Sequence, residues 1–75
     1  MLQKSVEAIL VSIVPLSIHG QVIWDVLFAP LGVPGTTTVV ARIGPESVDE
    51  GLQPGDRIVV DSVFGVVSRI RRAAA

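Results

Sequence analysis

The segment over residues 38–65, TVVARIGPESVDEGLQPGDRIVVDSVFG, constrains the fold of this chain more than any other stretch. It predicts a strand over 36–43, one short acidic helical turn near 46–50, and a second strand over 57–63. Its valines and isoleucines suit strands better than helices. The segment contains no obvious catalytic group, so it indicates the fold of the chain and not a catalytic activity.

A tight turn is predicted between the acidic segment and the second strand. Pro54 and Gly55 fit the centre of a type II turn, because proline fixes the second residue and glycine supplies a positive φ at the third. Asp56 follows them, and we expect its carboxylate to hydrogen-bond the backbone of the turn.

The rest of the chain supplies further short elements. Residues 5–14 are apolar at both parities, which predicts an N-terminal strand buried on both faces, with a helix as the rival interpretation. Pro15 is expected to end either element. Residues 21–28 alternate in polarity as a strand does, and 66–71 form a last strand.

Glycine and proline residues separate these elements. Residues 29–35, APLGVPG, predict a loop with apolar residues inside it, and 73–75 are a short tail that is either native or a cloning remnant. Several short strands with such turns are typical of a small, partly closed β-barrel. We therefore expect a single, mostly β domain over 1–75.

Composition argues for assembly. A chain of 75 residues buries only about 60% of the surface that its unfolded form exposes. It contains no cysteine, so disulfides and thiolate metal sites are excluded, and oligomerisation is the remaining common source of stability. Hydrophobic residues make up 49% and charged residues 17%, so part of the apolar surface needs a partner. The net charge of −1 gives no field that would attract nucleic acid.

Membrane insertion and export are not favoured. The apolar run over 6–18 contains Glu7 and Pro15, and it is shorter than the roughly 20 residues that a spanning helix needs. Lys4 precedes the run, as in a signal peptide, but Glu7 interrupts its start and no A-x-A-like cleavage site follows.

Two stretches resemble the GroES-like fold of co-chaperonins and of the barrel domain in medium-chain alcohol dehydrogenases. They are VARIGP over 40–45 and GLQPGDRIVV over 51–60. The resemblance implies a small, partly closed barrel. It also implies that residues 25–38 stand where co-chaperonins carry a mobile loop, with 26–28 in place of its hydrophobic tripeptide. The strand over 5–14 is extra to that pattern and would substitute for the strand that pairs neighbours in the ring.

The sequence lacks the residues that the enzymatic interpretations require. A zinc dehydrogenase needs cysteine ligands, and no strand–GxGxxG–helix unit offers a dinucleotide site. His19 has no Ser/Asp partner that the sequence identifies and is interpreted as a turn residue. The carboxylates lack calcium-loop spacing and are interpreted as solvated turn residues. We therefore expect no enzyme activity, catalytic residue, cofactor or metal. The carboxylates in question are Asp49, Glu50, Asp56 and Asp61.

The candidate site is a contact surface. Arg69, Arg71 and Arg72 are expected to form salt bridges to the acidic 46–61 region of the same or a neighbouring subunit, in preference to phosphate contacts. Trp24 and Phe28 have a core interpretation as well as an interface one. The apolar candidates for partner contact are Trp24, Val26, Leu27, Phe28, Leu31, Val33, Ile9, Val11 and Ile13.

The function hypothesis is a non-enzymatic structural subunit of a homo-oligomer or shell, with a virion decoration or capsid-associated protein as the specific case. Its partners would be copies of itself and a larger assembly, and its location the virion or the cytoplasm. The alternative is a reduced co-chaperonin that caps a chaperonin ring through 26–35. A third hypothesis, a peptide-binding module, needs an open strand edge beside the 31–33 loop.

Overall fold

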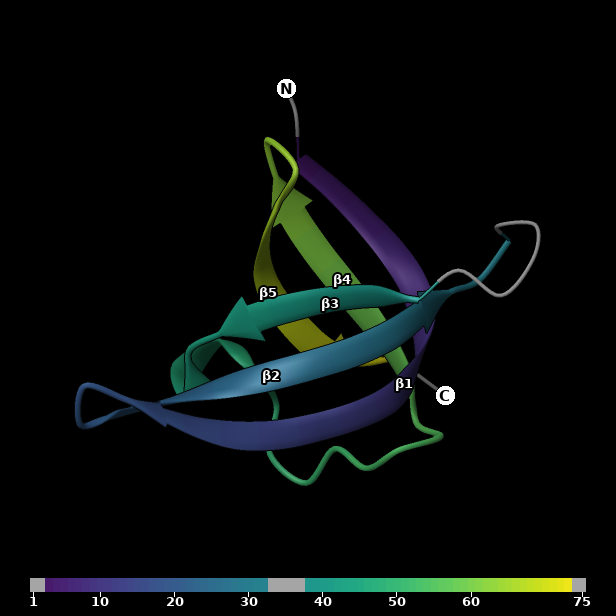
Figure 1. The fold of residues 1–75 in the computed structure, drawn as a ribbon. Coiled ribbons are helices and arrows are strands. Elements are labelled where there is room, and N and C mark those ends of the chain that lie inside the picture. Colours follow the sequence, from purple (N-terminus) through teal and green to yellow (C-terminus); the bar gives the residue numbers. More distant parts are fainter. Residues whose placement is uncertain (1–2, 33–37, 74–75) are drawn as a thin grey trace.

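A computed structural model describes residues 3–32 and 38–73 of the chain (Figure 1). It consists of five strands and a single 3-10 turn among those residues. Their bounds are β1, Gln3–Ile18; β2, Gln21–Pro30; β3, Val39–Ile43; η1, Pro45–Ser47; β4, Arg57–Val63; and β5, Val66–Arg72. In the described part of the chain, no helix is long and apolar enough to cross a membrane.

The strands form one antiparallel sheet in the order β3-β2-β1-β4-β5. Three consecutive strands and a fourth that returns beside the first make a Greek key. The sheet curls until β3 and β5 approach each other without pairing among the described residues (Figure 1). The expected mostly β, partly closed barrel is confirmed.

The N-terminal strand differs from its expected place and length. We expected an added strand over 5–14, but β1 lies at the centre of the sheet and pairs with both β2 and β4. It also runs through Pro15, which faces Trp24 on β2. Proline is tolerated here because the pairing with β4 ends at Ile9, so the far side of β1 is an open edge.

A register shift in β1 explains its apolar residues at both parities. The shift lies between Leu10 and Ser12, opposite Leu27 on β2. Ala8 and Leu10 face the core before it, and Ile13 packs against the core after it. One extra residue therefore moves the core-facing positions to the other parity. The expectation of a strand buried on both faces was wrong.

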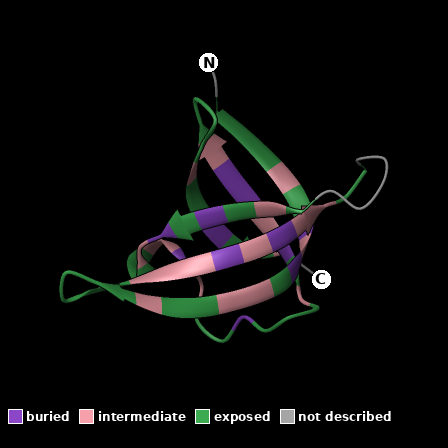
Figure 2. Ribbon diagram, in the orientation of Figure 1, coloured by how far each residue is buried: buried purple, intermediate pink, exposed green. Residues whose placement is uncertain are grey.

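The core fills the concave side of the sheet. Figure 2 shows buried positions alternating with less buried ones along β2 and β3. Its largest fully buried side chains are Leu10, Val26, Ile58 and Ile70, one from each of β1, β2, β4 and β5. Val48 and Leu52, in the segment that follows η1, also belong to the core.

The predicted turns lie where the sequence places them. The acidic helical turn is η1, Pro45–Ser47, which begins one residue earlier and ends sooner than the predicted turn near 46–50. Gly55 has a φ of +95°, and the Asp56 N–H donates to the Gln53 carbonyl at 3.0 Å. The Asp56 carboxylate in turn accepts from the Gln53 N–H at 2.9 Å. Both the turn and the role expected of Asp56 are confirmed.

Candidate interaction surface

The convex side of β1, β2 and β3 is apolar and open to solvent. We call this surface, Val14, Leu16, Ile23, Leu27 and Val40, the outer face. Cross-strand pairs hold these residues side by side, Leu16 with Ile23 and Leu27 with Val40. Val40 is 61% exposed and Val14 is 49% exposed. A partner that covered this face would remove several large apolar side chains from water.

One ion pair crosses the outer face. Asp25 and Arg42 are paired in register on β2 and β3, with Arg42 Nε 3.5 Å from Asp25 Oδ1. That oxygen is buried and has no hydrogen-bond partner among the described residues. The separation gives an ion pair without hydrogen-bond geometry, so Asp25 retains unused capacity to accept a hydrogen bond.

A second apolar feature stands at the β4–β5 hairpin. Val63 and Val66 pair around a two-residue turn of Phe64 and Gly65, both with positive φ, which is the type I′ geometry. Phe64 is 73% exposed at a φ of +53°. A bulky residue is unusual in that region of backbone space, where asparagine or glycine is favoured.

A hollow of about 300 Å³ opens at one end of the barrel, between β1, β2 and the segment that follows β3. Apolar side chains line most of it, and Asp49 and Glu50 are its acidic residues. The apolar lining is Ile13, Trp24, Pro45, Val48 and Leu52. Half-buried Trp24 is thus compatible with both its core interpretation and its interface interpretation, because it packs against the core and also lines an open hollow.

The other expected contact residues separate into three groups. Val26 and Phe28 are core residues, so their interface interpretation was wrong; their parity on β2 directs them inward. Leu27 lies on the outer face, Ile9 is half-buried, and Val11 and Leu31 are exposed. Val33 lies outside the described residues, as do parts of the 29–35 loop and of the 73–75 tail.

The expected loop over 29–35 begins later than predicted. Ala29 and Pro30 belong to β2, where they pair with Ile9 and Ala8. Residues 26–28 therefore lie within a paired strand, which differs from the mobile loop that the co-chaperonin resemblance implies.

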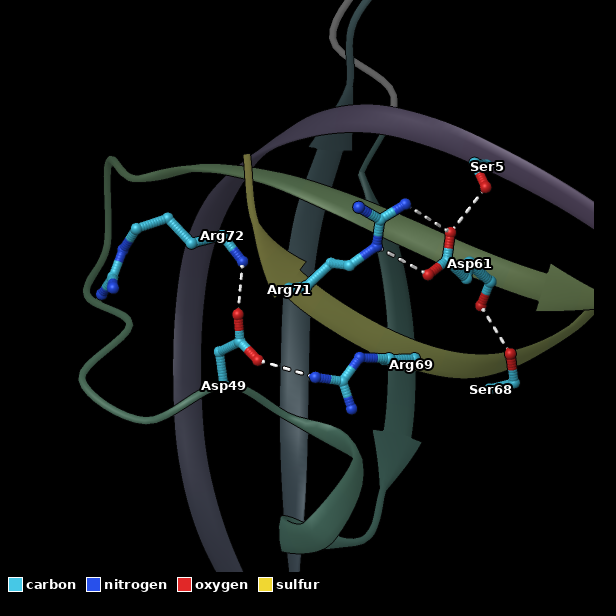
Figure 3. A network of polar contacts seen from close by, with 7 residues as sticks. All are labelled: Ser5, Asp49, Asp61, Ser68, Arg69, Arg71 and Arg72. Carbon is cyan, nitrogen blue, oxygen red and sulfur yellow. Dashed lines mark hydrogen bonds and ion pairs between the residues drawn. The ribbon is translucent and has the colours of Figure 1, made fainter. Parts of the chain in front are cut away.

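The C-terminal arginines bind the acidic region within the same chain (Figure 3). Arg69 Nη2 donates to Asp49 Oδ1 at 3.0 Å, and the Arg72 N–H donates to Asp49 Oδ2 at 2.9 Å. Arg72 Nη2 also donates to the Gly51 carbonyl at 3.2 Å. These bonds fasten the segment after η1 to the edge of β5. The predicted salt bridges are confirmed for Arg69 and Arg71, as contacts within one subunit, whereas Arg72 makes hydrogen bonds and, among the described residues, no salt bridge.

Asp61 is the buried centre of a second group in Figure 3. Arg71 donates to it from Nε at 2.9 Å and from Nη2 at 3.3 Å, and Ser5 Oγ donates at 2.6 Å. The hydrogen bond from Arg71 is the largest cause that holds the pKa of Asp61 below its ordinary value, and Ser5 adds to it. Three strands are joined at this point: β1, β4 and β5.

Sequence reasoning missed the most exposed apolar residues. Val14, Val22 and Val40 looked like ordinary strand residues, and Phe64 and Val66 flanked a turn that was predicted only from Gly65. The one signal that points to Phe64 is its place before Gly65 between two strands, where a small polar residue is typical. Comparisons with protein-family models, with curated proteins and with solved structures found no match to this chain.

Proposed function

We propose that this protein is a non-enzymatic structural subunit that assembles with copies of itself through the outer face. The observation that carries the proposal is the continuous apolar outer face, on which Val14 and Val40 are exposed, Val40 at 61%, and Leu16, Ile23 and Leu27 are half-buried. Face-to-face packing of two such sheets would bury them at a spacing of about 10 Å.

The charge distribution favours self-association over unspecific hydrophobic binding to other proteins. Among the described residues a single ion pair, Asp25 with Arg42, crosses the outer face, and both side chains are partly exposed. In a two-fold contact each patch meets its own copy, so Asp25 of one subunit can face Arg42 of the other. The finer proposal, a shell or virion decoration, follows from the small size and apolar surface of the unit.

A charge on the outer face tests this function. Sedimentation velocity of the wild-type protein should show a species heavier than one chain. Val40→Asp should shift that species toward the monomer by tenfold or more in dissociation constant, because a buried unpaired carboxylate is costly. Thr38→Asp is the matched control, since it adds the same charge to an exposed residue just outside β3. A wild-type protein that stays monomeric at high concentration contradicts the proposal.

The co-chaperonin alternative predicts different behaviour. It requires residues 26–35 to engage a chaperonin, although 26–30 are paired in β2 with Val26 and Phe28 in the core. Slowing of chaperonin ATP turnover by the purified protein would favour that alternative over the shell subunit.

A further inference from the structure

The two ends of the barrel differ in shape and charge. The hollow lined by Trp24 lies where β2 pairs with the end of β3, at Ile43. The opposite end of the same two strands, where Phe28 pairs with Val39, opens into a second hollow that Lys4 and Gly65 also line. The first end therefore has two carboxylates, Asp49 and Glu50, with Arg69 bound to Asp49 and Arg72 bound to the Gly51 carbonyl, and the second end has a lysine.

The β4–β5 hairpin projects beside the lysine end. Its turn is at a different corner of the molecule from η1, which borders the acidic hollow (Figure 1). Phe64 is 73% exposed there and adopts a positive φ that favours glycine or asparagine. No contact within the described part of the monomer explains a phenylalanine at this position.

We propose that Phe64 of one copy inserts into the Trp24 hollow of a second copy, with Lys4 of the first beside Glu50 of the second. This inference rests on the proposed function. It adds a second, directional contact between copies, separate from the contact through the outer face. The occupant is a second copy of the chain, because a projecting aromatic residue and an aromatic-lined hollow lie at opposite ends of one molecule. Phe64 and Trp24 would form the kind of aromatic pair that often anchors interfaces.

Charge complementarity supports this pairing. Among the described residues, neither Lys4 nor Glu50 takes part in an ion pair, whereas Asp49 is already bound to Arg69. A cation at one end and an unpaired carboxylate at the other favour head-to-tail contact and disfavour contact between like ends. Each copy would then bind two neighbours by unlike surfaces, which generates a ring if the rotation closes and a filament if it does not.

The substitution Phe64→Asn tests whether the side chain of Phe64 makes the proposed contact. Asparagine tolerates positive φ, so the unfolding midpoint in urea, measured at a concentration low enough for the monomer to dominate, should stay the same or rise. The dissociation constant for assembly, from sedimentation velocity, should rise by about 30-fold, which corresponds to the loss of an aromatic hot spot. Heavier species that persist unchanged in Phe64→Asn overturn this contact while the wider assembly proposal stands. A monomeric wild-type protein overturns both.

Charge exchange tests the orientation independently of Phe64. Lys4→Glu and Glu50→Lys should each weaken assembly, and the double variant should restore it toward the wild-type value. Glu46→Lys is the matched control, because it changes the same charge on the neighbouring turn outside the residues that line the hollow. Failure of the double variant to recover, or equal weakening by Glu46→Lys, contradicts the proposed contact.

Discussion

At the scale of single residues, Asp61 has the largest set of polar contacts in the barrel. Arg71 and Ser5 both donate to its carboxylate, and the side chain is buried. Asp61→Asn keeps the shape but removes the charge that Arg71 binds. We expect a loss of about 1–3 kcal/mol in the free energy of unfolding, measured by urea denaturation at pH 7.

The same residue predicts a pH dependence. Its pKa in the folded protein lies below the ordinary value of 3.8, so its contribution is fully present above that value and is lost as the pH falls through the folded pKa. The difference in stability between wild type and Asp61→Asn should therefore shrink below about pH 4. Glu7→Gln, in an exposed pair with Arg57, is the control and should change stability by less than about 0.5 kcal/mol. An equal effect of both variants would show that burial of Asp61 adds nothing.

At the scale of elements, the open edge of β1 is protected by one residue. Beyond Leu10, whose backbone bonds Gly55 and Asp56, the strand pairs only with β2 among the described residues, and no charged residue stands on it from there to its end at Ile18. Proline has no backbone N–H to donate to a strand from another molecule. Pro15 therefore disfavours the pairing of a further strand with this edge of β1.

Pro15→Val should therefore increase aggregation. The substitution restores a backbone donor and raises strand propensity at the open edge. We expect light scattering to develop faster at equal concentration, with the unfolding midpoint unchanged or higher. Ser17→Val adds a similar apolar side chain on the same edge without adding a donor, and should aggregate less than Pro15→Val. The reverse order would assign the protection to side-chain polarity.

At the scale of the whole molecule, stability should depend on protein concentration. A small barrel that leaves the outer face exposed has limited core, and assembly stabilises it by mass action. The melting temperature should rise by about 5–10 °C over a 100-fold increase in concentration. Val40→Asp should flatten that dependence, and a wild-type melting temperature that does not change with concentration would argue against assembly.

The sequence by itself determined the elements that depend on local chemistry. β4 has its predicted bounds, η1 begins at Pro45 directly after Gly44, and Gly55 and Asp56 form the turn their residue types favour. The salt bridge of Arg71 with Asp61 likewise joins the adjacent strands β4 and β5. These features involve neighbours in sequence or adjacent strands, so residue type and spacing suffice to predict them.

Only the tertiary structure decided which apolar residues are buried. The register shift at Val11 reversed the inward parity of β1, and the central place of that strand followed from a pairing with β4 some fifty residues away. Val26 and Phe28 went to the core while Val14 and Val40 were left outside, although all four are similar in hydrophobicity. Side-chain chemistry is the same on both faces of a strand, and the curvature of the partly closed sheet determines which face is enclosed.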